Sequence, residues 1–146
     1  MIYSKQIIYN DEKHITKDKV DLEIKLQNYV SSKYSFCPKI IDVVYSNDHC
    51  TIHMENLEEM CIADKYGDDI THVPIEIISQ IRNIIKILFD DGIEYIDITP
   101  YNFIEKANVV YIIDFGHAYE KKKNHHTNWF LEEFLQGVNK WNPDFA

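Results

Sequence analysis

The sequence predicts an α+β protein, in which short strands and amphipathic helices follow one another without an internal repeat. Several short runs of β-branched and aromatic residues, each bounded by turn residues, indicate strands. A longer segment after Pro74 has isoleucine and leucine at helical spacing, which indicates a long, largely buried helix. With 45% hydrophobic residues among 146, the chain can bury a core around these elements.

The first half is predicted to run strand, helix, strand, strand. Residues 2–9 form the first strand, which Asn10 and Asp11 close as a turn. Asp18 is the predicted N-cap of the helix that follows. Strands over residues 40–45 and 50–54 complete this half. The apolar positions of the helix are Leu22, Leu26, Tyr29 and Val30.

The second half is predicted to hold the longest helix and a hairpin. Pro74 opens the helix, and Gly92 is placed to end it in a left-handed cap. Residues 93–98 lead into a polar loop. A strand ending at Phe103 and Ile104, a turn at 106–108 and a strand over 109–113 then form the hairpin. A last helix over 128–136 is predicted to bury its aromatic side chains, and Trp141 is predicted to anchor the tail.

The bulk composition excludes some classes of function. The formal net charge of −9 argues against a nucleic-acid partner, which needs a basic surface. No apolar run is long enough to span a membrane. Three scattered cysteines without a C-x-x-C pair indicate free thiols in a reducing compartment, which we expect to be the cytoplasm. The basic run 121–123 is expected to be a solvated loop, and His117, His125 and His126 match no zinc-ligand spacing.

Two acidic loops, separated by the hairpin, carry the candidate chemistry. The first contains Asp97 and, five residues later, Asn102; the second is Asp114-Phe115-Gly116. Phosphoryl transfer requires one carboxylate to orient or accept the hydroxyl proton, and oxygen ligands for a divalent cation. Mg²⁺ prefers carboxylate and amide oxygens together with phosphate. The spacing therefore predicts a phosphoryl-transfer site.

These two loops resemble the catalytic loop and the D-F-G motif of the protein-kinase superfamily. The resemblance implies that Asp97 is the catalytic base, that Asn102 and Asp114 hold Mg²⁺, and that ATP is the phosphoryl donor. It also implies a protein-kinase-like fold with a reduced N-lobe and a minimal C-lobe. Residues 1–146 would form one truncated kinase-like domain, divided into residues 1–57, with the hinge, and residues 58–146.

The resemblance extends to the first half of the chain. Glu23 matches the ion-pairing glutamate of the first kinase helix, and Lys5 is the candidate partner on the strand before it, in competition with Lys13, Lys17 and Lys19. The strand over 50–54 looks like the strand that leads into the kinase hinge. The implied nucleotide-binding residues of this segment are Met54, Glu55, Asn56 and Leu57.

The chain departs from the kinase pattern in two ways. Four residues precede Lys5, and none of the four glycines lies in a G-x-G-x-x-G motif, so we expect the two strands and glycine-rich loop that cover the phosphates to be missing. Tyr95 stands where kinases usually have histidine, and Thr99 where they usually have lysine. A small hydroxyl residue at position 99 is similar to the RIO-type and KEOPS-associated atypical kinases.

The expected function is transfer of the γ-phosphoryl group of ATP to a serine or threonine of a protein. The alternatives are a weakly active or inactive kinase mimic that binds a regulatory protein, and a small-molecule phosphotransferase. The expected partners are thus a nucleotide and a protein, with no nucleic acid and no membrane. The exposed sheet edge of the N-lobe is in addition a route to a homodimer.

Overall fold

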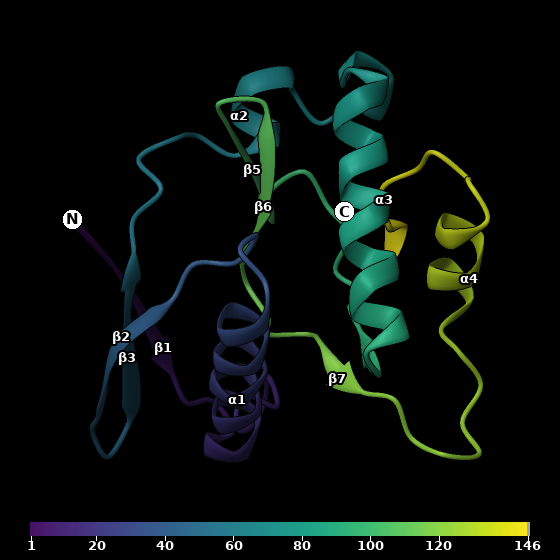
Figure 1. The fold of residues 1–146 in the computed structure, drawn as a ribbon. Coiled ribbons are helices and arrows are strands. Elements are labelled where there is room, and N and C mark those ends of the chain that lie inside the picture. Colours follow the sequence, from purple (N-terminus) through teal and green to yellow (C-terminus); the bar gives the residue numbers. More distant parts are fainter. Residues whose placement is uncertain (146) are drawn as a thin grey trace. The chain divides into compact units, whose positions relative to one another are not determined.

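The computed structural model describes residues 1–145 and divides into two units, Met1–Glu58 and Glu59–Ala146. Both combine helices with small antiparallel sheets, which agrees with the predicted α+β class (Figure 1). The first unit contains β1 (Ile2–Ile8), α1 (Lys17–Lys33), β2 (Ile40–Tyr45) and β3 (His49–Glu55). The second contains α2 (Ile62–Tyr66), a 3-10 turn (Ile70–His72), α3 (Ile75–Asp90), β4 (Ile93–Glu94), β5 (Phe103–Lys106), β6 (Val109–Ile112), β7 (Tyr119–Glu120), α4 (Trp129–Leu135) and a 3-10 turn (Pro143–Phe145). Within the described part of the chain, no helix has the length and apolar character needed to cross a membrane.

The first unit is a three-stranded sheet with α1 packed against one face. The strand order is β1-β3-β2, and both pairs are antiparallel. Alternate residues of β3 point to the helix and are fully or almost fully buried, because the period of a strand is two. With two residues of α1 they form the core of this unit: Val20, Ile24, Cys50, Ile52 and Met54.

The N-cap of helix α1 lies two residues before the one predicted at Asp18, so that prediction was wrong. Thr16 is the N-cap, because its backbone is extended and its hydroxyl accepts the N–H of Lys19. Asp18 lies inside the first turn, where a carboxylate is favoured by the helix dipole. The inward position predicted at Tyr29 was also wrong, since this side chain is exposed.

In the second unit α3 is the central element, and it ends as predicted. Pro74 is its N-cap, and its carbonyl accepts the N–H groups of Ile77 and Ile78. Gly92 follows the last turn with a φ of +84°, and its N–H donates to Phe89 at 3.1 Å. The buried positions of α3 are Ile77, Ile78, Ile81, Ile84, Ile85 and Leu88.

Strands β5 and β6 form the predicted hairpin, with Phe103 opposite Ile112 and Lys106 opposite Val109. Its turn residues, Ala107 and Asn108, both have positive φ, which is the twist that a tight two-residue hairpin needs. The turn predicted at 106–108 is confirmed. The register matters for the site, because the residues just outside it, 102 and 113, are brought side by side.

Three elements of the second unit were not predicted from the sequence. Helix α2 has five residues, and β4 and β7 have two residues each. Elements of this length contain at most about one and a half periods of a hydrophobic pattern, which is too short for periodicity to reveal them. The β4–β7 pair sets Glu94 opposite Tyr119, and the N–H of Lys121 extends it by donating to Gly92.

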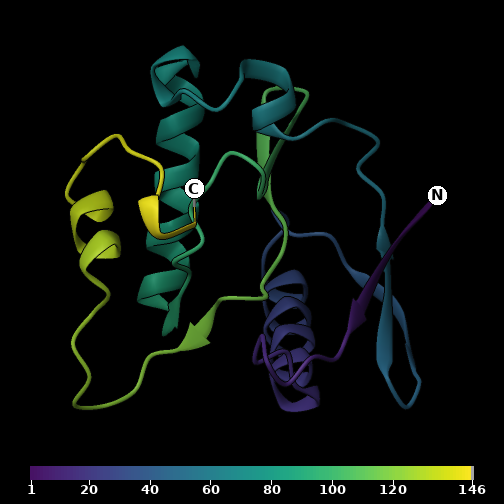
Figure 2. The same ribbon diagram turned by 180° about the vertical axis from the view of Figure 1, so that it is seen from behind.

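Helix α4 lies alongside α3 in both views of the chain (Figures 1 and 2). Asn128 caps it, because the side-chain oxygen accepts two N–H groups of the first turn. Arg82 of α3 holds its other end, where Nε donates to the carbonyl of Phe134 at 2.8 Å. The prediction that the aromatic residues of this helix are buried holds for Phe130 and Phe134 and was wrong for Trp129, which is 50% exposed.

Candidate functional site

The loop between β4 and β5 is folded tightly onto its own backbone. The carbonyl of Asp97 accepts two hydrogen bonds, from the N–H of Thr99 at 3.1 Å and from Nδ2 of Asn102 at 2.9 Å. The second bond spans the loop and closes it. Because the loop side chains Asp97, Thr99 and Asn102 are at most 9% exposed, these bonds lie in a largely dry environment. The D-x4-N spacing therefore serves a definite geometry, in which the asparagine fixes the backbone of the aspartate.

The hairpin joins this loop to the second acidic motif. The carbonyl of Asn102 accepts the N–H of Ile113 at 2.9 Å, which extends the β5–β6 ladder by one pair. Asp114 is the next residue. The structure thus brings Asn102 next to the backbone that carries Asp114. The side-chain amide of Asn102 uses its NH₂ group on Asp97, so Oδ1 is the atom that it can offer to a cation.

Asp114 has a backbone conformation that few side chains adopt. Its φ is +64°, in the left-handed region, where a residue other than glycine is uncommon. Its Oδ1 accepts the N–H of Gly116 at 3.0 Å, and this local bond is one reason why aspartate tolerates the conformation. Phe115 between them is 1% exposed and anchors the motif in the core. Strain of this kind is concentrated at functional sites.

Tyr95 departs from the kinase pattern, and the structure gives it a clear role. Its hydroxyl lies 2.7 Å from the carbonyl oxygens of both Ile113 and Asp114. One hydroxyl proton can be donated to either of them or shared. The ring is 1% exposed and meets Phe115 edge to face, with centroids 5.5 Å apart. Tyr95 therefore connects the first acidic loop to the second.

Asn142 in the C-terminal tail also holds the first loop, and nothing in the sequence pointed to it. It is fully buried, and its N–H and Nδ2 donate to the carbonyls of Ile98 and Ile96 at 2.9 and 2.7 Å. Its Oδ1 accepts the N–H of Asp144. All of its side-chain polar groups are used, and two of its bonds flank Asp97. A single asparagine in a polar tail has no periodic or motif signal that could have revealed this role.

In the first unit, Lys5 and Glu23 form the predicted ion pair. Lys5 Nζ lies 2.6 Å from Glu23 Oε2, and the two side chains are 25% and 6% exposed. Of the competing lysines, Lys17 pairs with Asp21 instead. Burial of Glu23 beneath the lysine keeps the ammonium group in a defined place, on the side of β1 that faces α1.

The segment predicted to bind adenine is partly used by the first unit itself. Met54 is 6% exposed and belongs to its core, where its sulfur lies 3.5 Å from Gln27. The N–H of Glu55 donates to Lys39, and the N–H of Asn56 donates to Met1. The remaining backbone groups of this segment, including those of Leu57, are the ones that a ligand could use.

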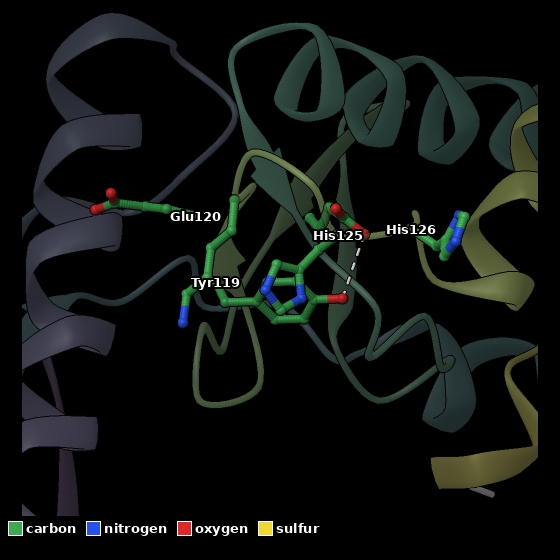
Figure 3. Close-up of a pocket in the computed structure, with 6 residues that line it drawn as sticks. Tyr119, Glu120, His125 and His126 are labelled. Carbon is green, nitrogen blue, oxygen red and sulfur yellow. Dashed lines mark hydrogen bonds between the residues drawn. The ribbon is translucent and has the colours of Figure 1, made fainter.

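A further hollow of about 290 Å³ lies in the second unit, around the β4–β7 pair (Figure 3). Glu94, one of its lining residues, is 2% exposed and accepts hydrogen bonds from the hydroxyl of Tyr119 and the N–H of Asn128, at 3.2 and 3.1 Å. Burial and the Glu94 carboxylate raise the pKa of Tyr119 to about 12. Figure 3 shows Glu120 and His126 pointing in opposite directions. The histidines predicted not to form a zinc site, His125 and His126, line this hollow.

Comparison with protein-family models and with curated proteins gives no match for this chain.

Proposed function

We propose that this chain is an atypical kinase that transfers the γ-phosphoryl group of ATP to a serine or threonine hydroxyl of a protein, on a protein-kinase-like fold. The observation that carries the proposal is the arrangement around Asn102. Its side chain fixes the backbone of Asp97, and its carbonyl accepts the N–H of the residue before Asp114. Three residues of the chemical types that phosphoryl transfer needs are thereby tied together through one short hairpin.

Each residue has a separate role in this proposal. Asp97 orients the acceptor hydroxyl and takes its proton, for which its position in a rigid, largely buried loop is suited. Asn102 Oδ1 and the Asp114 carboxylate hold the cation. Lys5, kept in place by Glu23, binds the α- and β-phosphates as a point charge. The free backbone groups of Glu55–Leu57 bind the adenine.

The donor set fits Mg²⁺. This ion takes oxygen ligands and is usually held by one or two carboxylates, with phosphate and water completing the shell. The described residues contain no cluster of three or more His, Cys, Asp and Glu side chains that could hold a metal. A site with one carboxylate and one amide needs none, since the nucleotide supplies the other oxygens. Bound there, Mg²⁺ would neutralise the charge that develops on the transferring phosphoryl group.

The proposal is tested by transfer of labelled γ-phosphate from ATP, with Mg²⁺ and a generic protein acceptor. We expect label in the wild type, and a loss on the order of 10²-fold or more in Asp97→Ala and in Asp114→Ala. Asp68→Ala is the matched control, because Asp68 is an exposed aspartate of the same unit outside both acidic loops. Equal labelling by the wild type and both site variants would overturn the proposal.

A thermal-shift titration separates binding from turnover. A protein that binds Mg²⁺ with ADP is stabilised in proportion to the logarithm of ligand concentration, once this exceeds the dissociation constant. We expect stabilisation in the wild type and in Asp97→Ala, and its loss in Asp114→Ala. Stabilisation without phosphoryl transfer to protein or to a panel of small metabolites would identify a nucleotide-binding kinase mimic and contradict the catalytic proposal.

A further inference from the structure

The outer edge of β1 is a feature that the proposed function does not use. At the two ends of the β1–β3 pair, the N–H of Tyr9 donates to Asp48 and the N–H of Asn56 donates to Met1. Directly opposed residues of an antiparallel pair alternate between hydrogen-bonded and non-hydrogen-bonded positions. The register is unbroken from Ile2 to Ile8. The odd-numbered residues of β1 therefore bond to β3, and the even-numbered residues direct their N–H and C=O groups to the opposite side.

No other strand in the described part of the first unit pairs with that side, since β1 is at the end of the strand order. The even-numbered residues are all exposed, whereas the odd-numbered Lys5 and Ile7 are half-buried. Two of the even-numbered residues are large and apolar, and Ile2 and Ile8 are 53% and 62% exposed. An exposed edge of this kind is a template for another strand. In order along the edge, the side chains are Ile2, Ser4, Gln6 and Ile8.

We infer that two copies of this chain pair through β1, antiparallel, about a twofold axis at Lys5. In this register Ile2 of each copy lies opposite Ile8 of the other, and Ser4 lies opposite Gln6. The order apolar, polar, polar, apolar is self-complementary, because reversal of the strand sets like against like. All four edge residues then fall at hydrogen-bonded positions, and cross-strand pairs of matched character stabilise a sheet.

Other registers of the same pairing fit less well. A shift by two residues sets Ile2 opposite Gln6, or Ile8 opposite Ser4, and no isoleucine of either copy is then opposite an apolar residue. A shift by one residue would turn the exposed face of one strand to the helix-packed face of the other. The self-complementary order therefore selects both the occupant, a second copy, and the alignment.

The axis brings the two Lys5 residues opposite each other, and like charges in that position are unfavourable. Here each ammonium group lies 2.6 Å from the carboxylate of Glu23 in its own copy. The local charge is thereby balanced before the strands meet. Lys5 also occupies a non-hydrogen-bonded position of the new pair, so its backbone keeps its bonds to β3.

The mass of the chain in solution tests the pairing. We expect light scattering to give 17.4 kDa on dilution and twice that mass in concentrated samples. Gln6→Pro removes an edge N–H that the monomer does not use, and edge strands accept proline at such positions. We expect this variant to associate at least tenfold more weakly. Val44→Lys is the control, since Val44 is 47% exposed on β2, the strand at the other edge of the same sheet.

The register has its own test. Ile8→Lys sets a lysine against Ile2 and should weaken association, whereas the double variant Ile2→Glu with Ile8→Lys sets glutamate against lysine twice and should restore it. Circular dichroism checks that each variant is folded. A wild type that stays monomeric up to millimolar concentration overturns the inference, as does a double variant that associates no better than Ile8→Lys. The result does not depend on kinase activity.

Discussion

The hydroxyl of Tyr95 lies 2.7 Å from the carbonyl oxygen of Asp114, so a side chain of the first acidic loop holds the backbone of the second. The same hydroxyl lies 2.7 Å from the carbonyl of Ile113, and the ring packs against Phe115. One residue thus makes a polar and an apolar contact to the same motif. Substitution of Tyr95 can separate the polar contact from the apolar one.

Tyr95→Phe keeps the ring contact and removes the hydroxyl. Because Tyr95 is buried, its two acceptor carbonyls lose a donor in a largely dry environment, and we expect a loss of about 1–2 kcal/mol in the free energy of unfolding. We also expect weaker binding of Mg²⁺ with ADP, since Asp114 is less well held. Urea unfolding and thermal shift measure the two effects. Tyr101→Phe, at a site 59% exposed, is the control and should be unchanged; a Tyr95→Phe protein that matches it in both assays would contradict this role.

Asn102→Asp tests whether the asparagine is needed for more than its oxygen. The substitution puts a carboxylate where Nδ2 donates to the carbonyl of Asp97, so two acceptors face each other in a buried place. We expect destabilisation of about 1–3 kcal/mol and loss of phosphoryl transfer, although a carboxylate is the better magnesium ligand. Chemical denaturation and labelled transfer check this. Activity equal to the wild type would show that closure of the loop by this bond is dispensable.

Asn142→Ala should slow the reaction without changing how ATP binds. The substitution removes the bond from Nδ2 to the carbonyl of Ile96, next to Asp97, while Lys5 and the segment proposed to bind adenine are untouched. We expect a lower kcat with KM for ATP within about twofold of the wild type, the pattern of a lost positioning contact. Asn139→Ala is the matched control, because Asn139 is an exposed tail residue that bonds to Arg82. A proportional rise in KM would argue against positioning.

We expect ionisation of Tyr119 to lower the free energy of unfolding in alkaline solution. Its pKa is raised to about 12 by burial and by the nearby Glu94 carboxylate, whereas an exposed tyrosine titrates near pH ~10. The unfolded chain therefore loses this proton first as pH rises. The stability that it contributes is complete below about pH 10 and is lost between about pH 10 and 12. We expect the free energy of unfolding to fall less over this range in Tyr119→Phe than in the wild type; parallel pH profiles would disprove the assignment.

Sequence reasoning located the elements whose signals extend over several turns or depend on one special residue. Helix α3 was predicted because its isoleucines repeat over sixteen residues. Its end was predicted because glycine readily adopts the positive φ of a left-handed cap, and Gly92 has this conformation in the structure. The start of α1 was misplaced, because Thr16 and Asp18 are both good caps and only the structure shows which one has an extended backbone.

The residues of the candidate site also divide into those that a sequence pattern reveals and those that it does not. Asp97, Asn102 and Asp114 could be named because their spacing is a motif, and Lys5 could be paired with Glu23 because a strand and a helix start lie between them. Tyr95 and Asn142 could not be assigned, since both act on backbone carbonyls. Any hydrogen-bond donor of suitable length can do this, so sequence patterns carry no signal for it.

The positive φ of Asp114 has a consequence for how the site can be lost. A glycine there would remove the side-chain crowding of the left-handed region, about 1 kcal/mol, which offsets the lost bond to the N–H of Gly116. Asp114→Gly should therefore fold about as well as the wild type and fail to hold a cation. On the proposed function, the carboxylate of Asp114 is therefore dispensable for folding and required for the cation, so folding and metal binding can be lost separately at this position.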